Sequence, residues 1–480
     1  MAQKKPLYIT TTLPYVNADP HIGFALEIVQ ADIVARYHTL MQREVFFTTG
    51  TDEHGQKIFQ VATKEGRDVQ EYVDHFAGQF GKLKDSLNLS YNAFIRTTES
   101  RHIEAAQELW RRCEQAGDIY KKKYKGLYCV GDEMFLKETD IVDGKCPNHP
   151  NMDPVEIEEE NYFFKLSAYQ DKLLAYLARE DSILPQWRRQ EAIKFVSDGL
   201  EDFSISREKA RMSWGIPVPG DETQVMYVWF DALTNYISTV GWPDTEGDFK
   251  KYWQEGEVVQ VAGKDQVRFQ SIMWQAMLMS GQVKNTDRVV YHGFITSGGQ
   301  KMSKSLGNVI DPFAIVEEYG TDALRYFLAR HVHPFDDSDV TMERFKDVYN
   351  ADLANGLGNL ASRIMQLSEK NNVTTVFTTT NKSSGLEQNI SKAMESYHLN
   401  EALEYIWSEI QRVDRQITEK EPFKVIKSDP VIGKALIQFF VQELHAIAVA
   451  LQPFLPETSK KILVAVKENK KPENLFPRKD

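Results

Sequence analysis

Residues 7–49 read LYITTTLPYVNADPHIGFALEIVQADIVARYHTLMQREVFFTT, and this stretch decides the fold. A β-rich run at 7–12 leads through a loop containing Pro14 into a helical pattern at about 21–42, and a second β-rich run follows at 45–49. Strand, helix and strand in alternation predict a parallel sheet, because two parallel strands need a crossover connection that is usually a helix. The sequence therefore predicts an α/β fold of the doubly wound type.

Further along the chain the pattern changes twice. β-rich runs at 258–262 and 289–296 predict later strands of the same sheet, whereas residues 118–225 contain cysteines, an acidic cluster and many aromatics, which indicates an insertion. From about residue 352, leucines recur every three or four positions, which predicts a helix bundle. We expect an α/β domain in two halves, 1–117 and 226–330, an insertion at 118–225, a linker at 331–351 and a helical domain at 352–480.

The amino-acid composition excludes several classes of protein. The chain has 480 residues, of which 42% are hydrophobic and 26% charged, and this excludes a disordered chain, a collagen-like chain and a small disulfide scaffold. Its three cysteines, Cys113, Cys129 and Cys146, fit a reducing compartment, and Cys113 is expected to be buried. The N-terminus lacks the apolar run of a signal peptide, and polar residues interrupt the apolar stretch 435–455, which predicts a core helix. We expect a cytoplasmic protein that does not enter a membrane.

The charge distribution limits where a nucleic acid could bind. The net charge is −12, whereas a protein that binds nucleic acid usually carries a basic surface. Residues 400–480 hold 13 Lys and Arg against 12 Asp and Glu, so the acidic excess lies in the rest of the chain. A basic surface is therefore expected to be local, and the helical third is the least acidic part.

A first motif, Pro20-His21-Ile22-Gly23-Phe24, stands where the first helix is expected to begin. The N-terminus of a helix favours anions through its unpaired N–H groups, a histidine there can donate to a phosphate, and a glycine lets a flat base approach the backbone. A helix cap with a surface histidine explains the same residues equally well.

A second motif, Lys301-Met302-Ser303-Lys304-Ser305, follows Ser297-Gly298-Gly299-Gln300. Lysines on a loop that glycines allow to move can close on a triphosphate as charge develops in a transition state. For an arbitrary pair of lysines a solvated basic loop would be the better interpretation, but this string follows a predicted strand that ends at His292-Gly293-Phe294.

Together the two motifs resemble the HIGH and KMSKS signatures of class I aminoacyl-tRNA synthetases, and further motifs resemble those of the methionyl-tRNA synthetase family. The resemblance extends from residue 7 to 478, and its motifs occur in the family's order. It implies a Rossmann-type catalytic domain split by a connective-peptide insertion, a stem-contact linker at 331–351 and an all-α anticodon-binding bundle. The further motifs are Thr51–Gly55, Tyr227–Tyr236, Gly263–Asp265, Asp322–Tyr326, Asn359–Arg363 and Leu475–Arg478.

The activity implied by the resemblance is the ligation of methionine to tRNA(Met) in two steps, with ATP and Mg²⁺ as the substrate complex. Because an anion attacks an anion in the first step, positive charge must strengthen in the transition state. The resemblance assigns this catalytic role to His21, Lys301 and Lys304. It assigns ATP binding to His21, Gly23, Gly263, Lys264, Asp265, His292, Gly293 and Lys304.

For methionine the resemblance implies a carboxylate for the α-amino group and a soft apolar pocket. Asp52 matches the carboxylate, and Leu13, Tyr15, Trp229, Ala232, Tyr236, Phe269 and Gln270 match the pocket. Aromatic rings suit a thioether, although an aromatic set is more often ordinary core. Gln270 replaces a histidine that is usual in the family, and we expect its amide to orient Tyr236 or a pocket water.

Two further sites are implied outside the reaction centre. Asn359 and Arg363, one helical turn apart, match residues that read the anticodon, and Phe423 stands where the family usually has a tryptophan that stacks on a base. A packing role for Phe423 after Pro422 is the alternative. Zn²⁺ is the expected metal of a knuckle formed by Cys129, Asp132, Cys146 and His149, with Asp132 in place of a usual cysteine.

Departures from the family pattern keep two other interpretations open. Phe24 replaces the last histidine of HIGH, and Gln275 stands where a proline is usual. A catalytically impaired tRNA-binding paralogue would explain Phe24, and a small-molecule adenylyltransferase would explain the HxGH pattern but not a helical domain at 352–480. A dimerising module found in many relatives is missing after Arg478, so we expect a monomer.

Overall fold

The structure, a computed structural model, describes residues 4–129, 134–136, 141–142, 144–147, 151–302, 307–375 and 384–480. It divides into two compact units. The first unit comprises Met1–Pro20, Arg43–Lys82 and Tyr91–Tyr291, and the second comprises His21–Gln42, Leu83–Ser90 and His292–Asp480. The first predicted helix therefore belongs with the C-terminal helices rather than with the strands that flank it in the sequence.

A six-stranded sheet forms the centre of the first unit, in the order β3-β2-β1-β12-β13-β7. The recorded pairings of β1 with β2 and β12, of β2 with β3 and of β13 with β7 are all parallel, which confirms the predicted parallel sheet. β1 is buried along its whole length, as expected when helices cover both faces of a parallel sheet. The strands are β1 (Leu7–Thr11), β2 (Val45–Thr51), β3 (Ala93–Arg96), β7 (Ile183–Leu184), β12 (Glu257–Gly263) and β13 (Arg288–His292).

Two small antiparallel sheets interrupt this fold in sequence between β3 and β12. One has the order β5-β4-β6-β8, and the other the order β10-β11-β9. Their strands are β4 (Ile119–Cys129), β5 (Met134–Leu136), β6 (Val155–Phe164), β8 (Phe203–Ser204), β9 (Ser206–Glu208), β10 (Pro217–Val218) and β11 (Asp221–Met226). The two-residue strand β7 comes from the same stretch of chain, yet it pairs with β13 at the edge of the parallel sheet.

The helices of the first unit surround a core that contains the buried Trp110, Trp253 and Trp274. Short 3₁₀ and π segments at Leu166–Tyr169, Phe249–Gln254, Lys264–Gln266 and Phe269–Met273 join these helices to the strands. The helices are α2 (Gln56–Lys64), α3 (Val69–Ser86), α4 (Ser100–Gln115), α5 (Gln170–Leu177), α6 (Gln186–Ser197), α7 (Val228–Leu233), α8 (Asn235–Ser238) and α9 (Trp274–Ser280).

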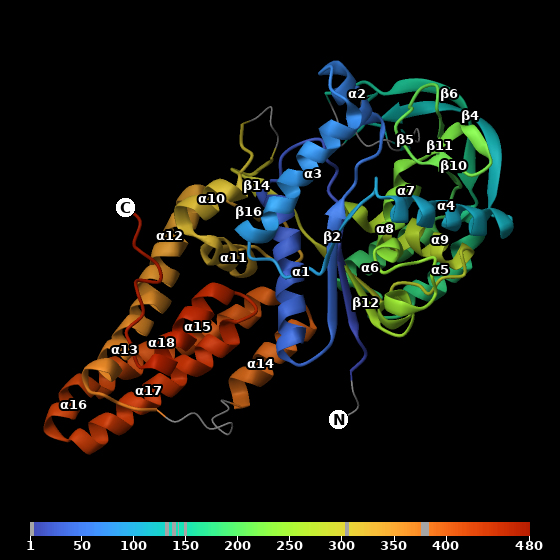
Figure 1. The fold of residues 1–480 in the computed structure, drawn as a ribbon. Coiled ribbons are helices and arrows are strands. Elements are labelled where there is room, and N and C mark those ends of the chain that lie inside the picture. Colours follow the sequence, from blue (N-terminus) through green and yellow to red (C-terminus); the bar gives the residue numbers. More distant parts are fainter. Residues whose placement is uncertain are drawn as a thin grey trace. The chain divides into compact units, whose positions relative to one another are not determined.

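The second unit is mostly helical, which confirms the predicted C-terminal bundle. Helices α13, α15, α17 and α18 pack against one another in it (Figure 1). A small sheet of order β15-β14-β16 accompanies them, with β14 (Ile295–Ser297), β15 (Gln300–Lys301) and β16 (Ser338–Asp339). The helices are α1 (Ile22–Leu40), α10 (Pro312–Tyr319), α11 (Thr321–Arg330), α12 (Met342–Val348), the π segment Tyr349–Gly358, α13 (Asn359–Lys370), α14 (Ser384–Glu395), α15 (Leu399–Lys420), α16 (Pro422–Ser428), α17 (Pro430–Leu451) and α18 (Pro456–Glu468).

Helix α17 is 22 residues long and contains a stretch of 18 residues with a mean hydropathy of 1.3, so by length and composition alone it is able to span a membrane. Its buried residues recur every three or four positions, at Ile437, Phe440, Val441 and Leu444 among others. This face packs against α13, α15 and α18. A single buried stripe within a bundle is the behaviour of a core helix, as the sequence predicted.

Candidate functional site

The carboxyl ends of three neighbouring strands of the parallel sheet meet at one edge. β1 leads into Leu13 and Tyr15, β2 leads into Asp52, and β12 ends at Gly263. In open α/β sheets this edge is where ligands bind. The fold of the first unit therefore brings these predicted residues to one edge of its sheet.

The backbone of Asp52 holds the loop that follows β1. Its N–H donates to the carbonyl of Pro14 at 3.0 Å, and its carbonyl accepts from the N–H of Val16 at 3.1 Å. Tyr15 lies between these two bonds, and its hydroxyl accepts from the N–H of Ile58 at 3.4 Å. Asp52 is only 7% exposed. A nearly buried carboxylate beside a tyrosine is suited to binding a small cation such as an α-ammonium group.

Two aromatic rings of the predicted pocket stack face to face. The ring centroids of Trp229, on α7, and Phe269, in the π segment before α9, lie 3.7 Å apart with an interplanar angle of 12°. Both side chains are half-buried, whereas Ala232, one turn after Trp229, is buried. A stacked pair that keeps part of its surface accessible can cover a flexible thioether.

The expected hydrogen bond between Gln270 and Tyr236 is present. The Gln270 amide donates from Nε2 to the Tyr236 hydroxyl at 3.0 Å, and both side chains are buried. Gln275 in turn donates to the Gln270 carbonyl at 3.0 Å and to Thr286 at 3.1 Å. Its Oε1 accepts from Asn285 and from the Thr286 N–H. Gln275, a departure from the family pattern, thus supports the backbone that carries Gln270.

A buried hydrogen-bond network around Asp231 adjoins these residues, and the sequence analysis did not predict it. The two oxygens of Asp231 lie 2.7 Å from Nδ1 of His54 and 2.7 Å from Nε2 of His102. His102 Nδ1 lies 3.0 Å from the Ser238 hydroxyl. Burial by itself raises the pKa of Asp231, but the two imidazoles outweigh that effect and lower it. His54 and Asp231 stand inside the quoted motifs, whereas no local signal marks His102.

In the second unit, His21 caps helix α1. Its Nδ1 accepts from the Gly23 N–H at 3.1 Å, so Nε2 is left to carry the ring proton in the neutral form. A Cβ on Gly23 would lie 2.9 Å from His21 Cε1, so a larger residue there would displace the capping ring. The capping role is therefore confirmed, and it leaves the Nε2–H group as a donor for a phosphate.

His292 and Gly293 also have structural contacts within the second unit. His292 Nε2 lies 2.9 Å from the Glu27 carboxylate on α1, and both side chains are buried. A Cβ on Gly293 would lie 2.2 Å from the backbone of Asp336. Gly293 is thus required by a close backbone approach, independently of any nucleotide. The contact with Glu27 fixes His292 to the helix that His21 caps, within the second unit.

The residues that lead into the second motif form a tight hairpin in the second unit. Ser297 pairs with Gln300, and the two turn residues Gly298 and Gly299 have φ values of 63° and 73°. Two positive φ values in a two-residue turn favour glycine. Asp339 of β16 accepts from the Gly299 N–H at 2.7 Å and from Thr296 at 2.8 Å. Lys301 ends β15, and Lys304 lies outside the described residues.

The predicted RNA-reading residues lie on two helices of the second unit. Asn359 begins α13 and is exposed, and Arg363 donates from Nη1 to Asp414 of α15 at 2.5 Å. Phe423 on α16 is 40% exposed, whereas the preceding Pro422 is buried. At this exposure Phe423 is not a core residue, so its ring is accessible from solvent.

Two of the four predicted zinc ligands belong to one small buried cluster. Cys129, at the end of β4, and Cys146 share this cluster with Leu136, and neither forms a disulfide. Asp132 and His149 lie outside the described residues. No group of three potential metal ligands occurs within the described part of the chain. Two buried thiols in one cluster fit a structural zinc site.

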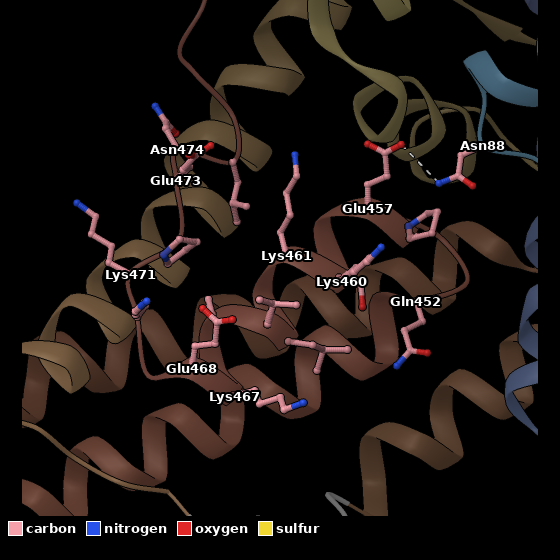
Figure 2. A pocket seen from close by; sticks show the side chains of 18 of the residues that line it. Asn88, Gln452, Glu457, Lys460, Lys461, Lys467, Glu468, Lys471, Glu473 and Asn474 are labelled. Atoms are coloured by element: carbon pink, nitrogen blue, oxygen red, sulfur yellow. Dashed lines mark hydrogen bonds between the residues drawn. The ribbon is translucent and has the colours of Figure 1, made fainter.

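A hollow of about 1330 Å³ lies in the second unit, between α18 and the chain that follows it (Figure 2). Its cations are Arg36, Lys460, Lys461, Lys467, Lys470 and Lys471, and its carboxylates are Glu457, Glu468 and Glu473. Glu457 accepts from Asn88 at 3.5 Å. None of the predicted site residues is among the described residues that line it.

Comparisons with known proteins agree with the motifs. The family model "tRNA synthetases class I (M)" matches residues 7–154 and 149–365. A methionine–tRNA ligase of Brucella suis is 42% identical over 474 residues, with 96% of this chain and 91% of that protein covered. A methionine–tRNA ligase of Rhizobium meliloti is 43% identical, with 96% and 92% covered, and one of Mycobacterium tuberculosis is 40% identical, with 96% and 91% covered.

Solved structures of similar fold are also methionyl-tRNA synthetases. The Mycobacterium tuberculosis methionyl-tRNA synthetase in complex with methionyl-adenylate superposes with a TM-score of 0.89 at 37% identity, and 99% of each chain is covered. The ligand-free form of that enzyme gives a TM-score of 0.83 at 35% identity.

Proposed function

Since the chain belongs to the methionyl-tRNA synthetases, within the class I tRNA synthetases, we infer that its site binds methionine at the carboxyl edge of the parallel sheet. The protein is an ATP-dependent methionine–tRNA ligase, and the relatives support this activity rather than an adenylyltransferase or an impaired paralogue. The observation that carries the site assignment is the meeting of Leu13, Tyr15, Asp52 and Gly263 at three adjacent strand ends.

In the first step, an oxygen of the methionine carboxylate attacks the α-phosphorus of ATP. The bond from that phosphorus to the bridging oxygen breaks, and pyrophosphate leaves with its electron pair. Asp52 binds the α-ammonium group, so the carboxylate is presented to the nucleotide. Trp229, Phe269, Ala232, Leu13, Tyr15 and Tyr236 surround the thioether, and the Gln270 amide fixes the Tyr236 hydroxyl.

The charge that develops on the phosphates requires donors that are already in position. His21 offers its Nε2–H because Nδ1 is engaged by Gly23. Lys301 and Lys304 add positive charge, and Gly263, Lys264, Asp265, Gly23, His292 and Gly293 complete the nucleotide site. Mg²⁺ arrives with ATP and neutralises phosphate charge. In the second step a terminal ribose hydroxyl of tRNA attacks the methionyl carbonyl, and AMP leaves.

The helical unit reads the tRNA in this proposal. Phe423 stacks on an anticodon base, and Asn359 and Arg363 bind base edges nearby. Residues 331–351 contact the RNA stem. Cys129, Asp132, Cys146 and His149 hold a structural Zn²⁺ ion, which would fix the loops of the inserted segment. The protein acts in the cytoplasm.

Pyrophosphate exchange, measured with each of the twenty amino acids, tests the assignment. Methionine should support exchange, whereas exchange with another amino acid but not with methionine would refute it. Lys304→Ala should lose roughly 2.7–4 kcal/mol of transition-state stabilisation, as expected for one preorganised donor. Lys467→Ala, a lysine of the hollow in Figure 2, is the matched control and should exchange like the parent.

The zinc assignment has a test that does not depend on activity. Elemental analysis of protein produced with ample metal should find about one equivalent of zinc, and Asp132→Cys should retain it, because thiolate suits Zn²⁺ at least as well as carboxylate. Protein without zinc would show that the knuckle is held together by packing alone.

A further inference from the structure

Asp231 lies on the same short helix as two residues of the proposed methionine pocket. It lies on α7 between Trp229 and Ala232, and its side chain is fully buried. Since Trp229 and Ala232 face the proposed ligand from the same short helix, any rotation of α7 would displace both. The side chain of Asp231 is therefore well placed to control the orientation of that helix.

The contacts of Asp231 reach the other walls of the same pocket. His54, which lies 2.7 Å from Oδ2, follows Asp52 by two residues at the end of β2. His102, which lies 2.7 Å from Oδ1, is on α4 and connects through its Nδ1 to Ser238 on α8, two residues after Tyr236. One carboxylate thus connects the elements that carry Asp52, Trp229 and Tyr236.

The two hydrogen bonds to the Asp231 carboxylate are charge-assisted. An ionised carboxylate accepts from both ring nitrogens that face it, and such charge-assisted bonds are about twice as strong as neutral ones. His54 is further confined by Trp214, whose ring centroid lies 5.6 Å away and whose Nε1 donates to the Glu53 carbonyl at 2.7 Å. Gly55, with a φ of 125°, turns the chain immediately after His54. The network is therefore rigid where it supports Asp52.

Glu53, the residue directly after Asp52, is held in a different way. Glu53 is buried and accepts from Arg96 at 2.6 and 2.9 Å and from Thr51 and Thr98 at 2.6 Å. These bonds fix the strand end to β3 and do not reach α7 or α8. The Asp231 network is distinct because it spans from the carboxylate for the ammonium group to the rings for the thioether.

We propose that Asp231, with His54, His102 and Ser238, is the positioning residue of the methionine pocket, setting the separation between Asp52 and the Trp229 and Tyr236 rings. Asp231 does not touch the substrate. Its carboxylate holds α7 at the distance from β2 that lets one ligand engage both ends of the pocket. The inference rests on the proposed binding of methionine at this edge of the sheet.

Asp231→Asn is the first test, because it removes the charge and keeps the shape. In pyrophosphate exchange we expect the KM for methionine to rise about tenfold, since small misplacements of binding groups have large effects, while the KM for ATP stays within about twofold. The rise in melting temperature that saturating methionine produces in the parent should shrink in this variant at the same concentration. Asp118→Asn, a carboxylate of the same unit that accepts from Tyr169 and Ser280, is the control and should keep both parental values.

A pair of variants at His54 separates positioning from mere stability. His54→Asn retains an amide donor near the position of Nδ1, and its KM for methionine should stay within about threefold of the parent. His54→Leu removes the donor and should raise that KM about tenfold or more. This pair also tests the idea if Asp231→Asn fails to fold.

Three results would overturn the inference. These are a parental KM for methionine in Asp231→Asn, an equal rise in the KM values for methionine and ATP, and equal behaviour of His54→Asn and His54→Leu. A parent protein that shows no methionine-dependent exchange would instead refute the proposed function itself, so the two failures are distinguishable.

Discussion

The guanidinium of Arg325 lies 2.8 Å from the carboxylate of Asp32, and neither side chain is exposed to solvent. Asp32 is on α1 and also accepts from Arg36 and from Ser90. Arg325 on α11 donates to the carbonyls of Leu87, Pro453 and Phe454. The Asp322–Tyr326 motif thus has a structural role, because it ties the helix capped by His21 to α11 and to the short segment between α17 and α18 within the second unit.

Replacing Arg325 should therefore destabilise the second unit. Arg325→Met leaves the buried Asp32 without its buried cation and removes three carbonyl contacts, and we expect a loss of about 3–5 kcal/mol. Urea denaturation followed by circular dichroism measures it. Lys194→Ala, which breaks an exposed pair with Asp198, should change stability by no more than about 0.5 kcal/mol. Equal losses in both variants would contradict the structural role of Arg325.

The sequence predicted the elements of the fold that have a long run of β-branched, aromatic or apolar residues. β1, β2, β12 and β13 all follow runs of β-branched and aromatic residues, and α17 follows from the apolar stretch 435–455. β7 was not predictable, because two residues, Ile183 and Leu184, are too short for any period. The grouping of α1 with the C-terminal helices also escaped prediction, because it depends on contacts such as Asp32 with Arg325, which lie far apart in sequence.

Gln270 gives a prediction about the methionine pocket. Gln270→His should keep the KM for methionine within about tenfold, because a ring nitrogen can still donate to the Tyr236 hydroxyl. Gln270→Leu should lose more, since a buried hydrogen bond disappears at a cost of about 1–3 kcal/mol. Pyrophosphate exchange over a range of methionine concentrations measures both. If both variants behave like the parent, Gln270 only lines the pocket.

The site itself was predictable to the extent that its residues stand in motifs. Asp52 and Trp229 each lie in a quoted motif, whereas Gln270 was identified by its match to a histidine that is usual in the family. The structure gathers all three in the first unit. His102 was missed because it is 129 residues from Asp231 and sits on an ordinary amphipathic helix. The pairing of Arg363 with Asp414, 51 residues later, was missed for the same reason. A one-dimensional pattern does not record which distant helix supplies a partner.

Phe423 allows the two steps of the reaction to be separated. Phe423→Ala should raise the tRNA concentration needed for charging by about 5- to 150-fold, because base stacking contributes roughly 1–3 kcal/mol per base. Methionine-dependent pyrophosphate exchange should stay near parental, since the first step needs no anticodon. Phe423→Trp should be neutral or slightly better. A packing role predicts instead a lower melting temperature and equal losses in both steps, and measuring all three on Phe423→Ala decides.

Cys113 should be chemically inert in the native protein. It is completely buried on α4, and burial raises the pKa of its thiol to about 12. At pH 8 only about 10⁻⁴ of such a thiol is ionised, and the thiolate is the reactive form. Mass spectrometry after brief treatment with iodoacetamide should find Cys113 unmodified in native protein and modified in urea. Rapid labelling of Cys113 without denaturant would contradict the burial.

The pairing of β7 with β13 limits how the molecule can be shortened. A truncated version that lacks the stretch between β3 and β12 would lose Ile183 and Leu184, the partners of Val289 and Val290. The exposed backbone of β13 would then offer its apolar edge to other molecules, and such edges are templates for aggregation. A minimal soluble catalytic fragment therefore has to retain these two residues or protect that edge with a charged substitute.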